Sequence, residues 1–231
     1  MEKFLSYIID LIDKYYHQKK INNFLIGLNL KRIFDVGAHK GEFLENILSL
    51  KKKSVIYCFE PQSSIFKNLK SKFKNKTNIS FFKLAISNAN RFKRLNINVK
   101  TSTSTFSSYN QNSIWKKIKD FLLTGFKNKS IINSEIVQTI SLDNFCRKKK
   151  IKIIDLLKID TEGHELQVLK GSKNLLKDKI KFILIEFHLS KIYKNYDIKK
   201  IEKILKKNNF VLIKKFKFPI LLFEDRIYMK K

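Results

Sequence analysis

The sequence predicts an α/β fold in which a mostly parallel sheet is covered by helices on both faces. From Arg32 onward, short β-rich runs alternate with helical runs, which is the pattern of such a sheet. An apolar strand also runs directly into a turn with two glycines, IFDVGAHKG at residues 33–41. A chain of 231 residues with 43% apolar residues can bury a substantial core. We therefore expect a single domain over residues 1–231.

The strands are predicted from runs rich in β-branched and aromatic residues, at 32–36, 54–60, 79–85, 153–160, 181–188, 210–216 and 220–228. Apolar residues at helical spacing predict the helices between them. Their core faces are Phe43, Leu44, Ile47 and Leu48; Ile65, Phe66, Leu69 and Phe73; Leu166, Leu169 and Leu175; and Ile198, Ile201 and Leu205. Only residues 217–219 separate the last two strands, so we expect a seven-stranded sheet whose last strand is antiparallel.

Two segments stand outside this alternation. Residues 1–30 form an N-terminal extension in which residues 3–18 read as an amphipathic helix, and packing on the domain is favoured over lying on a membrane. Residues 88–139 form an insertion with expected strands at 92–99 and 136–140, a Ser/Thr run at 101–108 and a helix at 113–125. A long insertion near the carboxyl ends of strands is a common place for a lid over a ligand.

The formal net charge of +29 would suit a nucleic acid or an anionic membrane. Only five of the 49 basic residues are arginine, however, although arginine makes most specific contacts to phosphates and base edges. Lysine, asparagine, isoleucine and phenylalanine all have A/T-rich codons, so we interpret much of the excess as compositional bias. A solvated, lysine-coated surface is thus favoured over a nucleic-acid-binding one.

The cysteines and apolar runs predict a cytoplasmic location. Cys58 and Cys146 lie far apart and form no CxxC pair, which indicates neither a metal knuckle nor a disulfide framework. Asp10 and Asp13 interrupt the N-terminal apolar residues, unlike a signal peptide. No apolar run approaches the roughly 20 residues that span a bilayer. The location could include the inner face of the membrane if the N-terminal helix lies on it.

Acidic and glycine residues at strand ends predict the site. In open α/β sheets, ligands bind beyond the carboxyl ends of the strands, where Asp35, Gly37 and Gly41 meet Glu60 of the next strand. Glu60 follows Gly41 by 19 residues, close to the spacing at which an acid reaches a ribose diol. We expect Gly37 to adopt a conformation closed to other residues and Gly41 to let a ligand approach closely. A buried, purely structural acid is the alternative for Asp35.

The glycine spacing helps to choose between NAD and S-adenosylmethionine, which both present an adenosine. A pyrophosphate rests on a G-x-G-x-x-G turn, whereas this turn is D-x-G-x-x-x-G with an acid at the end of the strand. An acid there would repel a pyrophosphate and suits a cationic methionine moiety. An NAD-dependent oxidoreductase is therefore the last of the alternatives.

Six ordered motifs resemble the FkbM-type S-adenosylmethionine-dependent methyltransferases over about residues 32–187. They are FDVGAHKGEF, IYCFEP, LAISN, TISLDNF, LLKIDTEGHELQVLKG and ILIEFH. The resemblance implies a Rossmann-like class I methyltransferase fold and methyl transfer, most often to an oxygen of a sugar or polyketide-like acceptor. His39 and Asn88 depart from the pattern, since a small polar residue and an acid are common at these places.

The resemblance also implies the cofactor site. Asp35, Gly37, Ala38 and Gly41 would hold the methionine part of S-adenosylmethionine, Glu60 its ribose, and residues 85–87 would lie beside the adenine. The full predicted cofactor-binding set is Asp35, Gly37, Ala38, His39, Gly41, Glu60, Pro61, Ala85, Ile86, Ser87 and Asp160.

Methylation of a hydroxyl needs a base that takes the proton as the bond forms. Asp160 is the first candidate for acceptor contact or base, with Glu162, Glu186 and His188 as the other catalytic candidates. Glu162 could instead cap a helix, as could Glu165, and His188 could be structural, as is expected for His164. A divalent metal held by Asp160, Glu162 and Glu186 is possible but not favoured.

The predicted function is O-methylation of a sugar hydroxyl in a cell-surface glycan or related glycoconjugate. The expected partner is accordingly a saccharide acceptor, with peripheral membrane contact as a further possibility. Two alternatives remain open at this point: an RNA methyltransferase, and a non-enzymatic basic module that binds membranes or nucleic acid on the same fold.

Overall fold

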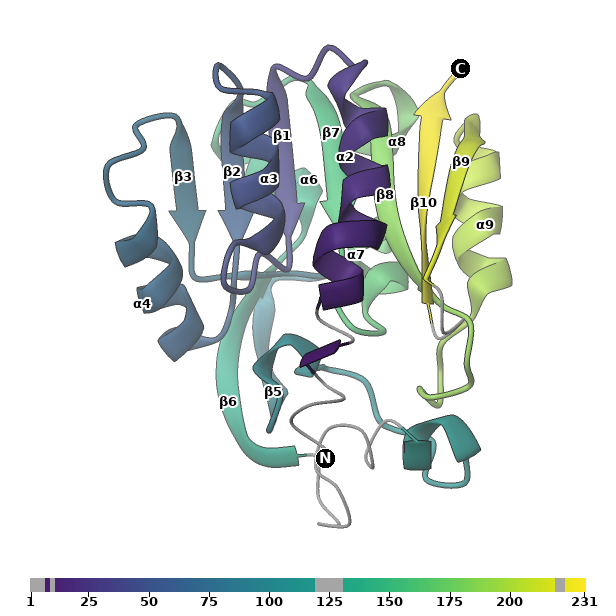
Figure 1. Cartoon of the computed structure of the whole chain (residues 1–231). Helices are drawn as coiled ribbons and strands as arrows, with labels where there is room; N and C mark the ends of the chain where they lie inside the picture. Colours follow the sequence, from purple (N-terminus) through teal and green to yellow (C-terminus); the bar gives the residue numbers. More distant parts are fainter. Residues whose placement is uncertain (1–6, 9–10, 119–130, 219–222) are drawn as a thin grey trace.

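The computed structural model describes residues 7–8, 11–118, 131–218 and 223–231. In this part of the chain one seven-stranded sheet dominates (Figure 1), in the spatial order β3 (Ile79–Phe82), β2 (Val55–Phe59), β1 (Arg32–Val36), β7 (Ile154–Ile159), β8 (Ile180–His188), β10 (Phe223–Lys230) and β9 (Phe210–Lys217). Neighbouring strands from β3 to β8 are parallel, and β10 is antiparallel to both β8 and β9. The predicted mostly parallel sheet with an antiparallel last strand is confirmed.

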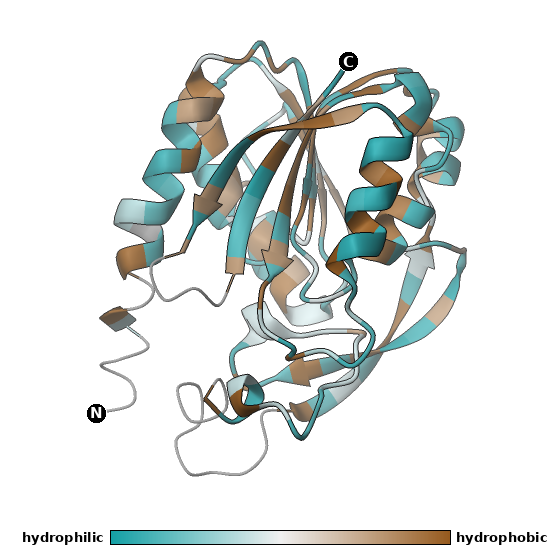
Figure 2. Ribbon diagram, turned by 90° about the vertical axis from the view of Figure 1, so that its right-hand side faces the viewer, coloured by the Kyte–Doolittle hydropathy of each residue, from teal (hydrophilic) through white to brown (hydrophobic). Residues whose placement is uncertain are grey.

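Helices cover both faces of this sheet and bury two separate cores. One face carries α2 (Gln18–Ile26), α3 (Glu42–Leu50) and α4 (Ser63–Lys72), whereas α6 (Leu142–Lys148), α7 (Glu165–Lys170), α8 (Leu175–Asp178) and α9 (Ile198–Lys207) cover the other. Leu44 of α3 packs in the first core and Leu169 of α7 in the second, both fully buried. In Figure 2, hydrophobic residues are coloured brown on the strands and also on the helices that flank them.

The insertion and the residues just before it form a small sheet beyond the carboxyl edge of the large one (Figure 1), with β4 (Ala85–Ile86), β6 (Ile131–Ile140) and β5 (Arg91–Asn98) in that order. The predicted single strand at 79–85 is therefore wrong. After Phe82 the chain leaves the large sheet, and Ala85 pairs with Thr139 instead. Both expected insertion strands are present. Of the helix expected at 113–125, residues 114–118 are helical and the rest lies outside the described residues.

The N-terminal helix is longer than predicted. Its described part runs from Leu11 through a π-helical turn, η1 (Asp13–His17), into α2 and ends at Ile26, not at residue 18. Ile21 and Leu25 continue the apolar stripe and are buried against the sheet, which explains the extension. Residues 3–6, 9 and 10 of the prediction lie outside the described residues. Within the described ranges, no helix has the length and apolar character to cross a bilayer.

Candidate active site

A cavity of about 880 Å³ opens at the carboxyl edge of the parallel strands. Its walls come from the turns after β1, β2, β7 and β8, from the insertion, and from the N-terminal helix. The strand ends are joined by backbone hydrogen bonds: Gly37 and Ala38 donate to the carbonyl of Phe59, and Asp160 donates to that of Val36. The parallel register therefore brings together turns that are far apart in sequence.

Gly37 is required by its backbone conformation and by close packing. Its φ is +87°, and a Cβ there would lie 1.8 Å from the carbonyl oxygen of Asp160. Any side chain would therefore push the β1 turn away from the β7 turn. Four of the residues that we predict to bind the cofactor line the cavity: Gly37, Ala38, His39 and Asp160.

Gly41 is also required, but not for the close approach of a ligand. Its φ is +86°, and a Cβ would lie 2.6 Å from Phe73 and 2.8 Å from Leu69. The residue allows α3 to begin against α4, and it is not part of the cavity wall. Our sequence-based reason for this glycine is therefore wrong, because the pattern alone does not tell which side of the turn is crowded.

Glu60 presents an anchored carboxylate at the end of β2. Its Oε2 accepts from the backbone N–H of His39 at 2.9 Å and its Oε1 from that of Gln62 at 2.8 Å. Burial raises the pKa of Glu60 to about 7, although these hydrogen bonds oppose the shift. Glu60 and Pro61 both line the cavity. The carboxylate is thus held in one orientation at the edge where β1 and β2 end.

Lys158 joins two acids at the centre of the site, and the sequence-based prediction missed it. Its Nζ lies 3.3 Å from Oδ1 of Asp35 and 3.1 Å from Oδ2 of Asp160. Asp35 is fully buried below the cavity wall, whereas Asp160 lines it. Burial raises the pKa of Asp35 and Lys158 opposes that shift. For Lys158, burial lowers the pKa, but the two carboxylates outweigh it and the net shift is upward.

The alternation of side chains along a strand could have shown, from the sequence LLKID alone, that Lys158 lies near the site. Residues 156, 158 and 160 share one face of β7, and Lys158 is the direct neighbour of Asp35 in the β1–β7 register. A lysine on the same strand face as an acid two residues later therefore indicated an ion pair. Asp35 is fully buried and is not part of the cavity wall, and its predicted role in holding the cofactor stays a prediction.

The predicted adenine-side residues divide into two groups. Ala85 and Ile86 line the cavity, whereas Ser87 does not. The Ser87 hydroxyl lies 2.9 Å from Nε2 of His164, and both residues are buried. Burial lowers the pKa of His164 to about 3, so this imidazole is neutral at physiological pH. The pair links the start of α7 to the residue after β4, and His164 also lines the cavity, so its structural role stays a prediction.

The turn between β7 and α7 is held in an uncommon conformation. Glu162 has a φ of +52°, and its carboxylate accepts a hydrogen bond from the hydroxyl of Tyr193. The Oε1 of Glu165 accepts from the backbone N–H groups of Thr161 at 3.0 Å and Gly163 at 3.1 Å. Burial raises the pKa of Glu165 to about 7. Glu165 therefore stabilises the turn from within, and Glu162 lines the cavity.

Glu186 and His188 continue the cavity wall along β8. The Nε2 of His188 lies 3.4 Å from Oε2 of Glu186 and 3.9 Å from Oε1 of Glu165. Burial, and after it the neighbouring carboxylates of Asp160 and Glu162, raise the pKa of Glu186 well above its usual value. The four predicted catalytic residues thus line one cavity. In the described part of the chain, no group of three or more His, Cys, Asp or Glu side chains is arranged to hold a metal ion.

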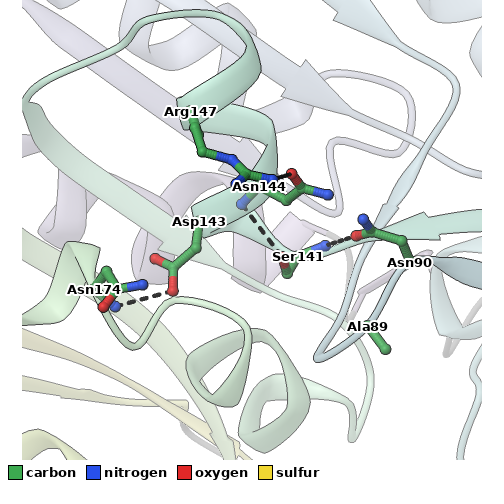
Figure 3. Close-up of a pocket in the computed structure, with 7 residues that line it drawn as sticks. All are labelled: Ala89, Asn90, Ser141, Asp143, Asn144, Arg147 and Asn174. Carbon is green, nitrogen blue, oxygen red and sulfur yellow. Dashed lines mark hydrogen bonds between the residues drawn. The ribbon is translucent and has the colours of Figure 1, made fainter.

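A second, shallower depression of about 380 Å³ lies apart from this cavity (Figure 3). Its polar groups are occupied by local structure. The Ser141 hydroxyl caps α6 by accepting from the N–H of Asn144, and Asp143 accepts from the N–H groups of Asn174 and Leu175. We interpret it as a helix-capping network and place the active site in the larger cavity.

The sequence matches known methyltransferases. The family model described as the methyltransferase FkbM domain matches residues 35–212. The 2-O-methyltransferase NoeI of Sinorhizobium fredii is 24% identical over 161 residues, 70% of this chain and 65% of that protein. The hexuronic acid methyltransferase AglP of Haloferax volcanii is 36% identical over 64 residues, 28% of this chain and 26% of that protein. The chain thus covers less than two thirds of either relative.

Solved structures share the fold. The methyltransferase FkbM of Methylobacillus flagellatus superposes with a TM-score of 0.55 at 12% identity, covering 88% of this chain and 45% of that one. An S-adenosylmethionine-dependent methyltransferase of Aquifex aeolicus superposes with a TM-score of 0.53 at 11% identity, covering 100% of this chain and 99% of that one. These likenesses establish the class I methyltransferase fold. Since the family model matches most of the sequence, the chain belongs to the FkbM family of S-adenosylmethionine-dependent methyltransferases.

Proposed function

We propose that the protein transfers the methyl group of S-adenosylmethionine to a hydroxyl group of a sugar. The observation that carries the proposal is the anchored Glu60 carboxylate beside the Gly37 turn, at the open edge of a class I methyltransferase fold. A carboxylate at the end of the second strand can accept hydrogen bonds from both hydroxyls of a ribose. The names of the two relatives, a 2-O-methyltransferase and a hexuronic acid methyltransferase, favour a saccharide acceptor.

The residues present fit this cofactor. Glu60 is available for the ribose, and Ala85 and Ile86 offer an apolar surface to the adenine. The insertion closes over these turns, because Thr101 accepts from Gln62 through its carbonyl and its hydroxyl lies 2.9 Å from Nε2 of His39. S-adenosylmethionine, when bound, supplies a methyl group made electrophilic by its sulfonium.

Asp160 is the side chain that we assign to the acceptor. It ends β7 in the cavity, and Lys158 holds its carboxylate from below at 3.1 Å. This contact fixes the carboxylate oxygens, so Asp160 can accept the proton of a hydroxyl or orient it. Glu162, Glu186 and His188 line the same side and could contact other hydroxyls. Because Lys158 also stabilises the charge of Asp160, orientation is favoured over proton removal as its main contribution.

The test is transfer of labelled methyl from S-adenosylmethionine to a panel of simple glycosides. We expect label in at least one sugar, loss of cofactor affinity in Glu60→Gln, and full activity in Asp178→Asn, whose side chain is exposed on α8 away from the cavity. A charge-assisted hydrogen bond contributes about 1.5–3 kcal/mol, so Glu60→Gln should weaken binding roughly 10-fold or more. Cofactor binding without transfer to any sugar would contradict the proposed acceptor.

A further inference from the structure

One wall of the cavity is built by residues outside the region that matches the family model. Residues 35–212 supply the Gly37 turn, Glu60 and Asp160. The remaining wall comes from the N-terminal helix and from the end of β9 and the start of β10: Asp13, Gln18, Ile21, Phe218, Phe223 and Asp225. The cofactor side of the cavity thus belongs to the family-matched region, and this flanking wall lies beside Asp160, the residue assigned to the acceptor.

A row of carboxylates crosses three adjacent strands beneath the flanking wall. Asp225 on β10 is the register partner of Glu186 on β8. Lys158 on β7 pairs with Leu184 on β8, so two residues further on Asp160 and Glu186 are neighbours on the same sheet face. All three side chains line the cavity. These acidic side chains lie at the end of the cavity away from Glu60, but the raised pKa of Glu186 means that this member of the row keeps its proton, so the negative charge comes from the other acids.

The N-terminal helix adds a fourth acid to this end. Asp13 lines the cavity and accepts a hydrogen bond from the Gln18 side chain at 3.3 Å. Burial raises the pKa of Asp13 to about 6, with smaller upward contributions from Asp225 and Asp160, so the group is ionised at pH 8. The helix is fixed by His17, which is fully buried and lies 2.7 Å from Asp225. Its imidazole contacts Phe218 and Phe223 edge-on.

The chemistry of this wall suits hydroxyl groups and opposes anions. Carboxylates and the Gln18 amide can hydrogen-bond sugar hydroxyls, and phenylalanine rings offer the apolar surface against which a sugar face packs. The lysines that line the described part of the cavity are Lys40, Lys100 and Lys158, and the charge of Lys158 is already shared by Asp35 and Asp160. A carboxylate or phosphate on an acceptor that lies against the flanking wall would meet the like charges of Asp13 and Asp225.

We propose that the N-terminal helix and the start of β10 form the acceptor subsite, and that this subsite selects an uncharged or amino sugar over one that carries a carboxylate or phosphate. The inference rests on the proposed function, because it names the class of acceptor for the same cavity. It also makes Asp13 and Asp225 specificity-determining residues that the family-matched region does not contain.

The test compares three matched glycosides at pH 8: p-nitrophenyl β-glucoside, the corresponding 2-amino-2-deoxyglucoside and the corresponding glucuronide. The readout is the kcat/KM for transfer of labelled methyl from S-adenosylmethionine. We expect the glucoside or the amino sugar to exceed the glucuronide at least about 10-fold, since each nearby charge is worth a substantial Coulomb energy. In the Asp13→Asn variant, the ratio of kcat/KM for the uncharged or amino sugar to that for the glucuronide should fall at least about threefold. The affinity for S-adenosylmethionine should stay unchanged within about twofold.

Asp225→Asn is a second test variant, and Asp178→Asn is the matched control that removes an exposed acid on α8. Thermal unfolding of each variant identifies those that fold, which matters for Asp225 because of its His17 contact. The inference would be overturned if the enzyme prefers the glucuronide, or if the kcat/KM ratio between the sugars is the same in Asp13→Asn as in Asp178→Asn. Either result would leave the proposed function standing. Labelling of none of the sugars by a protein that binds the cofactor would contradict the proposed function, and the inference with it.

Discussion

At the scale of single residues, the Asp35–Lys158–Asp160 group governs the site. A buried charge without a partner is strongly unfavourable, so Asp35 and Lys158 depend on each other, whereas the Asp160 side chain is 39% exposed. The sequence predicted the two acids because acids at strand ends are typical of ligand sites. It did not predict Lys158, because the chain has 44 lysines and only the strand register shows that this one lies beside Asp35.

Lys158→Met should destabilise the protein by about 3–5 kcal/mol, because it leaves the buried Asp35 carboxylate without its cation. Urea unfolding measures this free energy. Lys181→Met is the matched control: Lys181 pairs with Asp155 at 2.7 Å, but its side chain is 56% exposed, so the loss should stay below about 1 kcal/mol. The double variant Asp35→Asn/Lys158→Met should recover part of the stability. Equal losses in the two single lysine variants would refute the buried ion pair.

Asp160→Asn tests the assignment to the acceptor. The amide keeps the size of the side chain but loses the charge that pairs with Lys158 and that we propose orients the acceptor hydroxyl. We expect kcat to fall at least about 100-fold, because acid–base and orienting groups contribute factors of roughly 10²–10⁴, while the affinity for S-adenosylmethionine changes much less. Steady-state kinetics and calorimetry separate the two effects. An Asp160→Asn enzyme with near-normal kcat would remove this residue from the mechanism.

At the scale of elements, the turn between β7 and α7 is a pH-sensitive part of the fold. The pKa of Glu165 is raised by burial from 4.5 to about 7. The folded protein therefore keeps a proton that the unfolded chain releases between pH 4.5 and 7. The resulting stability is present at low pH and is lost as the pH rises to about 7. Burial also raises the pKa of Glu60, so this residue contributes to the same pH dependence.

Glu165→Gln should reduce this pH dependence. Glutamine can still accept from Thr161 and Gly163 through its carbonyl but does not titrate. Between pH 5 and 7 the free energy of unfolding of the variant should fall less steeply than that of the unchanged protein, by at most about 1.4 kcal/mol per pH unit. The lowered pKa of His164 makes the free energy of unfolding rise with pH. This contribution is the same in the variant and in the unchanged protein, so it cancels in the comparison. Urea titrations that give parallel pH profiles would contradict the role of burial at Glu165.

A second element-scale prediction concerns the contact between the insertion and the segment after β8. Tyr109 stacks on Tyr193 at 5.4 Å between ring centroids, and the Tyr193 hydroxyl donates to Glu162. Tyr193→Phe keeps the stack and removes the hydrogen bond, so Glu162 should lose its fixed position. We expect a lower kcat with nearly unchanged cofactor affinity, whereas Tyr196→Phe, whose hydroxyl contacts backbone groups, is the control. A loss that is equal in both variants would speak against a specific role for Glu162.

At the scale of the whole molecule, the sequence predicted what local patterns encode. Alternating strands and helices, the acid at residue 60 and the antiparallel last strand all follow from periodicity and turn residues. Three features could not be predicted because they depend on contacts between distant segments: the split at residues 83–84, the crowded side of Gly41, and the N-terminal helix beside β10. In each case the deciding partner lies far away in the sequence, as Thr139 does for Ala85.

Calorimetric titration with S-adenosylmethionine, S-adenosylhomocysteine and NAD in parallel tests the central claim most directly. The Gly37 turn and the anchored Glu60 carboxylate should bind the first two ligands, whereas an acidic strand end without a pyrophosphate-binding glycine pattern should not bind NAD. Glu60→Gln should weaken the binding of both adenosyl ligands. Binding of NAD, or the absence of binding by both adenosyl compounds, would contradict the account.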